Sequence, residues 1–182
     1  MKILILGIGN ILFADEGVGV HIVNLLKKKY SFEGEHEIEL MDGGTLAQHL
    51  IPIIVEYDYL ILVDTINAPK AQIGDVYFFD FDDIPSDVDW QGSAHEVEML
   101  QTLTMMDLVG DRPTTKIFGI VPTVIEPIEF SLTDAVRNAV DIVEKTLIEH
   151  LESLSVKTSI KEQITIDEIL PNSFKMNYDH TV

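Results

Sequence analysis

The chain has 182 residues, 46% of them hydrophobic, with 12 Lys and Arg against 31 Asp and Glu and a formal net charge of −19. That length suits one compact domain with a buried core, and the apolar fraction argues against general disorder. The charge argues against a nucleic-acid-binding face, which needs clustered lysine and arginine, and against docking on an anionic membrane. Because the chain has no cysteine, disulfides, thiolate metal sites and cysteine nucleophiles are also excluded.

The hydrophobic pattern and the composition also limit where the protein resides and which side chains can bind a metal. No apolar run reaches the roughly 18 residues of a membrane span, and the apolar start Met1–Gly7 is too short for a signal peptide. We therefore expect a cytoplasmic protein, a monomer, that binds neither nucleic acid nor membrane. Any metal must be bound through His, Asp or Glu side chains.

The first elements in chain order are a buried strand, a helix and a more exposed strand. The continuous apolar run Ile3–Leu6 is typical of a strand covered on both faces. From Val18 to Lys29, apolar residues recur at helical spacing, and three lysines end the helix where cations complement its dipole. Ile38 and Leu40 alternate with glutamates, which predicts a strand nearer an edge of the sheet.

The middle of the chain predicts two more strands. A short helix near Thr45–Leu50, interrupted or restarted at Pro52, precedes the buried strand Tyr59–Val63. Asp75–Phe81 is also predicted to be a strand, but the connection 64–74 is too short for a crossover helix. We therefore expect that strand to pair antiparallel. The aspartates that follow, within Asp80–Asp89, predict an exposed acidic loop.

The last elements are a helix over Ala94–Leu108, a buried strand Ile117–Val121, and a long helix that begins near Ser131 or Thr133. The order predicts an α/β fold, a three-layer sandwich with a mixed, mostly parallel five-stranded sheet flanked by helices. We expect a single domain over residues 1–155. Periodicity is lost after Ser155, and the sequence leaves the order of the extension 156–182 undefined.

The glycines after the first strand allow two interpretations. Gly7-Ile8-Gly9 resembles the start of a dinucleotide-binding loop, but the third glycine position holds Leu12 and the helix begins only near Gly17. Backbone freedom for a long loop explains the glycines better. A nucleotide-binding module remains an alternative.

Three residues with metal-ligand chemistry fall at or near the carboxyl ends of the predicted strands, where α/β folds collect their active sites. Glu16 precedes the first helix, Asp64 follows the strand Tyr59–Val63, and His95 begins the helix after the acidic loop. Two carboxylates and an imidazole suit Zn²⁺ or Ni²⁺. Each also has a purely structural alternative: Glu16 can complement a helix dipole, Asp64 can cap a loop, and His95 can be an ordinary helix residue.

The same residues carry a family resemblance. The segment 7–19, Gly-Ile-Gly-Asn-Ile-Leu-Phe-Ala-Asp-Glu-Gly-Val-Gly, resembles the opening motif of the [NiFe]-hydrogenase maturation endopeptidases. The likeness spans roughly residues 1–150 and continues through further motifs in the family's order. These are Asp42-Gly43-Gly44-Thr45, Val63-Asp64-Thr65, Ser93-Ala94-His95, Gly119-Ile120-Val121-Pro122 and Glu126-Pro127.

This resemblance implies an activity and a partner. Members of the family remove a C-terminal peptide from the hydrogenase large-subunit precursor after nickel has been inserted. The positions matching Glu16, Asp64 and His95 are the nickel-recognition ligands, so the resemblance implies that nickel arrives with the substrate and is not a resident cofactor. A surrogate divalent metal can occupy such a site.

The catalytic group is less well defined by the sequence. The substrate's metal can polarise the scissile carbonyl, or a carboxylate can activate water, as in aspartic-type proteases. Asp64 and Asp42 are the candidate catalytic carboxylates, although Asp42 can equally form an Asx-type turn before Gly43 and Gly44. His21, on the first helix, is expected to be a surface or half-buried packing residue. A metallohydrolase holding its own zinc in the same trio is a further alternative.

Overall fold

A computed structural model describes residues 1–86, 88, 94–123 and 131–170, with side chains in the helix that starts at residue 94 described from residue 98 onward. Glu126-Pro127, residues 171–182 and the aspartates 87 and 89 of the acidic segment lie outside the described residues. Within the described part, no helix is long and apolar enough to cross a membrane.

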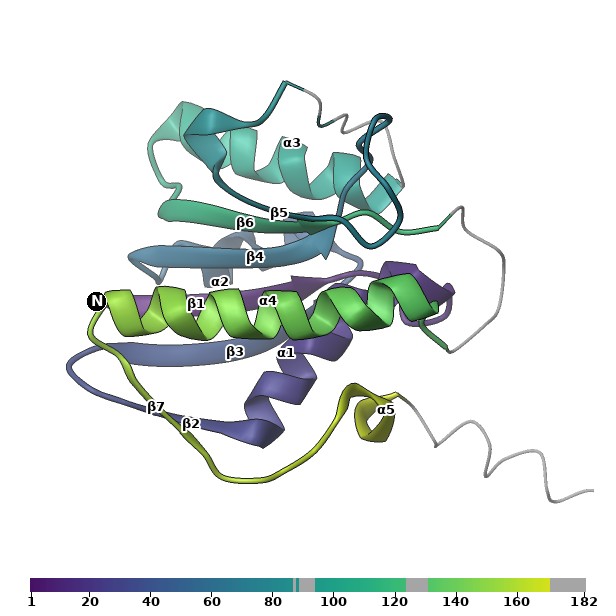
Figure 1. Cartoon of the computed structure of the whole chain (residues 1–182). Helices are drawn as coiled ribbons and strands as arrows, with labels where there is room; N and C mark the ends of the chain where they lie inside the picture. Colours follow the sequence, from purple (N-terminus) through teal and green to yellow (C-terminus); the bar gives the residue numbers. More distant parts are fainter. Residues whose placement is uncertain (87, 89–93, 124–130, 171–182) are drawn as a thin grey trace, which may run out of the picture.

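A five-stranded sheet forms the centre of the fold, with the strand order β3-β1-β4-β6-β5 (Figure 1). Its parallel strands are β1 (Lys2–Ile8), β3 (Glu37–Gly44), β4 (Tyr59–Thr65) and β6 (Thr114–Ile120). β5 (Val76–Asp80) is antiparallel, as predicted, and its partner is β6. The predicted mixed, mostly parallel sheet is therefore confirmed.

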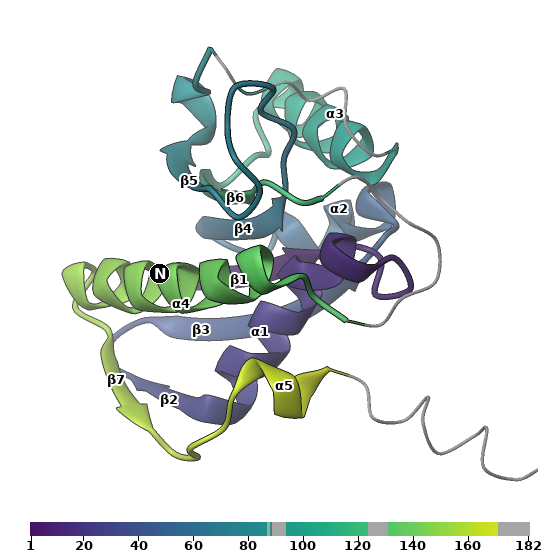
Figure 2. The same cartoon turned by 45° about the vertical axis from the view of Figure 1, so that its right-hand side comes forward.

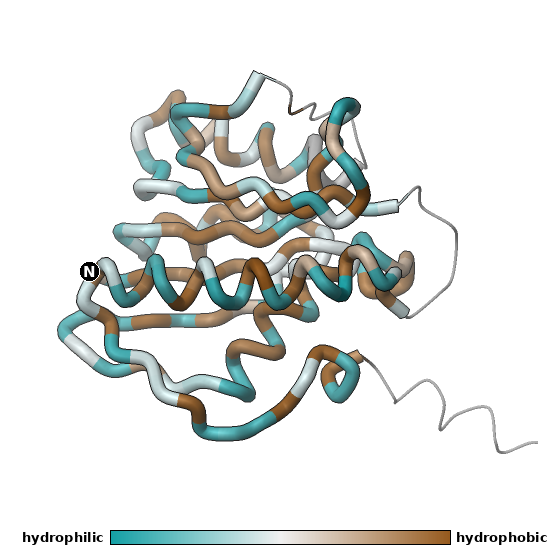
Figure 3. The backbone as a smooth tube through the Cα atoms, in the orientation of Figure 1, coloured by the Kyte–Doolittle hydropathy of each residue, from teal (hydrophilic) through white to brown (hydrophobic). Residues whose placement is uncertain are grey.

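Helices cover both faces of the sheet, which confirms the three-layer architecture. On one face, α1 (Val18–Lys29) and α4 (Asp134–Ser153) contribute to a buried cluster with alternate residues of the strands, including Ile3, Ile5 and Ile61. On the other face, α2 (Ile51–Ile54) and α3 (Ala94–Val109) pack on the intervening residues, such as Leu4, Leu6 and Leu62. Figure 3 shows the hydrophobic residues concentrated along the central strands.

Local sequence signals account for the helix boundaries. Thr133 caps α4, its hydroxyl accepting a hydrogen bond from the Val136 N–H at 3.4 Å. Pro52 stands in the first turn of α2 and follows the 3-10 helix η2 (Ala47–Leu50), so the proline restarts a helix at the position the sequence indicated. In α3, Met99, Leu103 and Met106 are buried at helical spacing, so one face of the helix packs on the sheet.

The extension after Ser155 packs on the domain as far as it is described. β7 (Lys157–Ile160) pairs antiparallel with β2 (Tyr30–Glu33) in a separate two-stranded sheet. The short helix α5 (Ile166–Ile169) contacts α1, and Ile164 and Ile166 join the core cluster on that face. An ion pair between Arg137 and Asp167 further ties α5 to α4. Residues 156–170 therefore share the core of residues 1–155.

The acidic segment is exposed at Asp82 and Asp83, as expected, but part of it is held by basic residues. The Arg112 guanidinium lies 2.7 Å from the Asp82 carboxylate and 2.9 Å from that of Asp107, and it stacks 4.4 Å from the centre of the Phe81 ring. Arg112 thus anchors the start of the loop to the end of α3.

Candidate functional site

The loop after β1 is drawn tightly against the carboxyl end of the sheet. Gly9 has φ +144°, and a Cβ atom built on it would lie 1.9 Å from the carbonyl oxygen of Glu16. Only glycine fits this combination of backbone angle and close approach. Gly9 therefore holds the backbone of Glu16, in the 3-10 helix η1 (Ala14–Gly17), directly over the end of β1.

The start of α1 makes a second close contact, with the neighbouring strand. A Cβ atom on Gly19 would lie 2.2 Å from the carbonyl oxygen of Val63 and 2.4 Å from that of Ile8. Val63 immediately precedes Asp64 in β4, and η1 also contacts β4. The two glycine contacts bring the segment carrying Glu16 and the strand end carrying Asp64 to the same edge, as predicted.

Both of these carboxylates are removed from bulk water. Glu16 is 5% exposed and Asp64 is 1% exposed. Asp64 Oδ1 accepts a hydrogen bond of 2.8 Å from the N–H of Thr65. Carboxylate oxygens are ligands for divalent metal ions, and α/β folds collect their sites at the carboxyl ends of the strands, so these two residues have the chemistry and the position of a cation site.

The third predicted ligand, His95, stands in the first turn of α3, one residue after the helix begins. Its side chain is not among the described ones. No group of three His, Asp or Glu side chains within the described set is close enough to hold a metal ion. Because the side chain of His95 lies outside the described ones, the trio of Glu16, Asp64 and His95 stays a prediction.

Asp42 lies near the carboxyl end of β3, level in the sheet with Val63, which precedes Asp64 in β4. Gly7 of β1 pairs with Asp42 on one side and with Val63 on the other. Strand spacing therefore puts the backbones at Asp42 and Asp64 about 10 Å apart. Asp42 is exposed, and its Oδ1 accepts a hydrogen bond of 3.0 Å from the Gly44 N–H. The Asx-type turn is present, and it leaves open a catalytic role for the carboxylate.

Two polar residues near the site were not among the predicted site residues. His21 in α1 is 4% exposed, and desolvation lowers its pKa to about 4, although the nearby Asp42 carboxylate acts in the opposite direction. The imidazole is therefore neutral at physiological pH. Its burial exceeds the expected surface or half-buried position, because its helix lies tightly on the sheet.

Asp15 is the second such residue. It is 2% exposed, and its carboxylate accepts hydrogen bonds from the Thr123 N–H at 3.1 Å and from the Thr133 N–H and hydroxyl at 2.8 and 2.9 Å. Asp15 stands beside Glu16 in the opening motif, but its hydrogen-bond partners follow more than 100 residues later in the chain. The sequence near Asp15 therefore does not indicate them.

The geometry of the glycine loop disfavours nucleotide binding. In a dinucleotide-binding fold the helix starts directly after the glycines and its N-terminus faces the pyrophosphate. Here η1 intervenes, and the space beside Gly9 is filled by the Glu16 backbone. The glycines serve packing within the chain.

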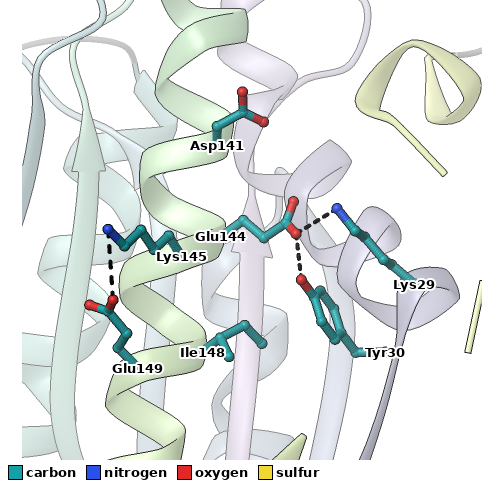
Figure 4. A pocket seen from close by; sticks show the side chains of 7 residues that line it. All are labelled: Lys29, Tyr30, Asp141, Glu144, Lys145, Ile148 and Glu149. Carbon is teal, nitrogen blue, oxygen red and sulfur yellow. Dashed lines mark hydrogen bonds and ion pairs between the residues drawn. The ribbon is translucent and has the colours of Figure 1, made fainter. Parts of the chain in front are cut away.

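A cavity of about 410 Å³ lies elsewhere, between the end of α1, β2 and α4 (Figure 4). Glu144 at its centre is 2.6 Å from both the Lys29 ammonium and the Tyr30 hydroxyl. Glu144 is eleven residues beyond the cap of α4, about 16 Å along the helix from the edge where Asp15 meets Thr133. This cavity is therefore separate from the candidate site.

Comparison with known proteins gives the family. The sequence model of the family described as hydrogenase maturation protease matches residues 20–150, well over half of the chain. The chain belongs to this family. It is accordingly an endopeptidase of hydrogenase maturation, as the resemblance in the opening motif implied.

Individual relatives agree with this assignment. Protein HydD of Wolinella succinogenes is 50% identical over 157 residues, which cover 86% of this chain and 99% of that protein. The hydrogenase 2 maturation protease of Escherichia coli is 28% identical over 165 residues, which cover 90% and 99%. Among solved structures, the hydrogenase maturating endopeptidase HybD from E. coli superposes with a TM-score of 0.74 at 27% identity, over 88% and 98% of the two chains.

Proposed function

We propose that this maturation protease acts in the cytoplasm, as a monomer, on the precursor of a [NiFe]-hydrogenase large subunit. It removes the precursor's C-terminal peptide after nickel has been inserted. Glu16, Asp64 and His95 recognise the nickel ion, which belongs to the substrate.

The observation that supports this proposal most is the pair of carboxylates at 5% and 1% exposure, held at one strand-end edge by the contacts of Gly9 and Gly19. Carboxylate and imidazole ligands bind nickel without the thiolates that hold a permanent ion more tightly. A site of this kind can contact a metal that is already partly coordinated by the substrate and then release it after cleavage.

Cleavage itself is assigned to orientation and to a carboxylate. Once the nickel is engaged, the adjacent peptide bond is held against the edge, which removes much of the entropic cost of the reaction. Asp64 contacts the metal, and Asp42 activates water at the scissile bond. Strand spacing supports this division, since it puts the backbones of the two residues about 10 Å apart. The nickel ion, when bound, polarises the scissile carbonyl. This division of roles gives the aspartic-type character of the protease.

Incubation with nickel-loaded and nickel-free precursor tests the proposal, with the new C-terminus read by mass spectrometry. We expect cleavage of the loaded form and no cleavage of the free form. Equal cleavage of both forms would exclude recognition of nickel. Stoichiometric zinc in the purified protein, together with cleavage of generic peptides, would favour a metallohydrolase with its own metal.

A further inference from the structure

β3 is one of the two edge strands of the central sheet, and β5 is the other. β3 pairs with β1 on one side, and among the described residues no strand pairs with its other side. Figures 1 and 2 show β3 at the lower margin of the five-stranded sheet in both views. Such a margin presents unpaired peptide groups, to which an extended chain can add as a further strand.

The hydrogen bonds define which peptide groups of β3 face outward. The Met1 carbonyl, at the start of β1, accepts a hydrogen bond of 3.0 Å from the Glu37 N–H and so faces β3. The next carbonyl, that of Lys2, accepts a hydrogen bond of 2.9 Å from the Asp58 N–H and so faces the β4 side. In a parallel pair, alternate residues bond to one neighbour. The peptide groups of residues 37, 39 and 41 therefore face β1, and those of Ile38, Leu40 and Asp42 face away from it.

This outer edge leads directly to the candidate site. The regular register of β3 with β1 runs to Asp42, after which it shifts, and the strand itself ends with Gly43 and Gly44. Gly44 has φ +57°, and a Cβ atom placed on it would meet nothing within 4 Å, so the space beside the strand end is open. A segment lying along β3 would thus reach the carboxylate to which the proposed cleavage is assigned.

We propose that the outer edge of β3 binds the C-terminal segment of the precursor as an added antiparallel strand. The inference rests on the proposed function, and chain polarity supports it. In an antiparallel strand, the amino-terminal end lies near Asp42 and the carboxyl end runs toward Glu37. The nickel-bearing body of the precursor, which precedes the scissile bond, then lies at Glu16 and Asp64, and the peptide to be released lies along β3.

The dimensions and charge of the edge specify the occupant further. From Glu37 to Asp42 the strand rises about 17 Å, enough to bind five or six residues of extended peptide. Glu37, Glu39 and Asp42 are exposed along it. Opposed like charges disfavour pairing with β3 of a second copy, whereas lysine or arginine in the peptide is favoured. The expected occupant is thus an extended peptide with basic residues.

Amide hydrogen exchange of the full-length protein tests this placement. The probe is a nickel-free synthetic peptide with the sequence of the precursor's C-terminal segment. At saturation, the amides of Ile38 and Leu40 should exchange at least about tenfold more slowly, while those of Glu39 and Met41, already bonded to β1, change little. Unchanged exchange at Ile38 and Leu40 would overturn the proposal, as would protection that depends on protein concentration and not on the peptide.

A pair of variants at one position separates the main chain from the side chain. Leu40→Pro removes an outward N–H without breaking the ladder to β1, and Leu40→Ala removes a comparable part of the packing but keeps the N–H. We expect Leu40→Pro to weaken peptide binding about tenfold and Leu40→Ala less than about threefold. Equal weakening in the two variants would contradict strand addition. If Leu40→Pro does not fold, the exchange experiment on the wild-type protein decides alone.

The inference and the proposed function fail in different ways. Peptide binding and exchange are measured without nickel and without cleavage, so loss of metal recognition leaves both unchanged. Conversely, nickel-dependent cleavage with no protection of the β3 amides would keep the proposed function and remove this binding mode.

Discussion

The carboxylate of Asp15 accepts hydrogen bonds from both the backbone N–H and the hydroxyl of Thr133, at 2.8 and 2.9 Å. Thr133 is the residue that caps α4, so one buried side chain joins the glycine-rich loop after β1 to the start of the longest helix in the described part of the chain. The same carboxylate accepts a bond from the Thr123 N–H just beyond β6. The 3-10 helix η1, which carries both Asp15 and Glu16, is thereby fixed to two distant segments.

Replacing Asp15 tests this anchor. Asp15→Ala leaves three donors without their acceptor in a buried setting, and we expect a loss of about 2–4 kcal/mol in the free energy of unfolding. Asp15→Asn keeps an acceptor oxygen and should cost about half as much. Urea denaturation measures both. A change below about 0.5 kcal/mol for Asp15→Ala would show that the bonds contribute little.

Glycine substitutions test the packing of the edge. A methyl group on Gly19 has no space beside the Val63 carbonyl, whereas one on Gly44 meets nothing within 4 Å. We expect Gly19→Ala to destabilise the fold by about 3 kcal/mol or more and to abolish cleavage. Gly44→Ala should lower the free energy of unfolding by only about 1 kcal/mol, because alanine is disfavoured at the positive φ of this position. Comparable thermal stability of the two variants would contradict the close approach of α1 to β4.

The buried His21 makes the stability of the fold depend on pH. Its pKa of about 4 lies below the value of 6.5 for the unfolded chain, so between these values the unfolded state binds a proton that the folded state does not. This contribution to stability is complete above pH 6.5 and is lost as the pH falls toward 4. Between pH 7 and pH 5 the loss is about 2 kcal/mol.

The matching measurement compares the wild type with His21→Phe, which keeps an aromatic ring but cannot be protonated. Urea denaturation at pH 7 and pH 5 should show a smaller decrease in stability for the variant, since other titrating groups are common to both proteins. Equal decreases would mean that the imidazole is accessible to protons in the folded state.

The cluster around Glu144 predicts a structural effect far from the site. Glu144 accepts a hydrogen bond from Tyr30, the first residue of β2, and forms an ion pair with Lys29, the residue before it. β2 is the strand that pairs with β7. Glu144→Ala leaves a half-buried ammonium without its carboxylate, and we expect a loss of about 2 kcal/mol. Asp141→Ala, at an exposed residue of the same cavity (Figure 4), is the control and should stay within about 0.5 kcal/mol. Similar stability of the two variants would show that the cluster does not fasten β2 to α4.

Variants of the proposed nickel ligands separate function from folding. Glu16→Gln and His95→Ala should each lower cleavage of nickel-loaded precursor at least about a hundredfold, while their unfolding free energies stay within about 1 kcal/mol of the wild type. His49→Ala, at an exposed histidine, is the control and should cleave normally. Normal cleavage by either ligand variant would remove that residue from the proposed trio.

The sequence predicted the central sheet well because its strands carry strong, continuous apolar signals. Ile3–Leu6 and Tyr59–Val63 lie within β1 and β4, and the short connection before β5 correctly indicated an antiparallel strand. β2 and β7 were not predicted, since four residues such as Tyr30-Ser31-Phe32-Glu33 give little periodicity. The two strands pair with each other, and the paired residues are up to 130 positions apart in the sequence, as are Tyr30 and Ile160.

The site was predictable only in part. The predicted position of Glu16 and Asp64 at one edge agrees with the structure, because parallel strands present their carboxyl ends together. The contacts that hold this edge, from Gly9 to Glu16 and from Gly19 to Val63, depend on the depth at which α1 packs. That depth also sets the burial of His21, and no local pattern encodes it.

The central claim is that the enzyme contacts the nickel of its substrate through Glu16, Asp64 and His95. X-ray absorption at the nickel edge measures this contact directly, on nickel-loaded precursor alone and on the same precursor frozen in complex with the protein. We predict that the complex adds oxygen and nitrogen neighbours to the nickel and that His95→Ala removes the imidazole component of that signal. An unchanged nickel ligand shell in a complex shown to have formed would contradict the account.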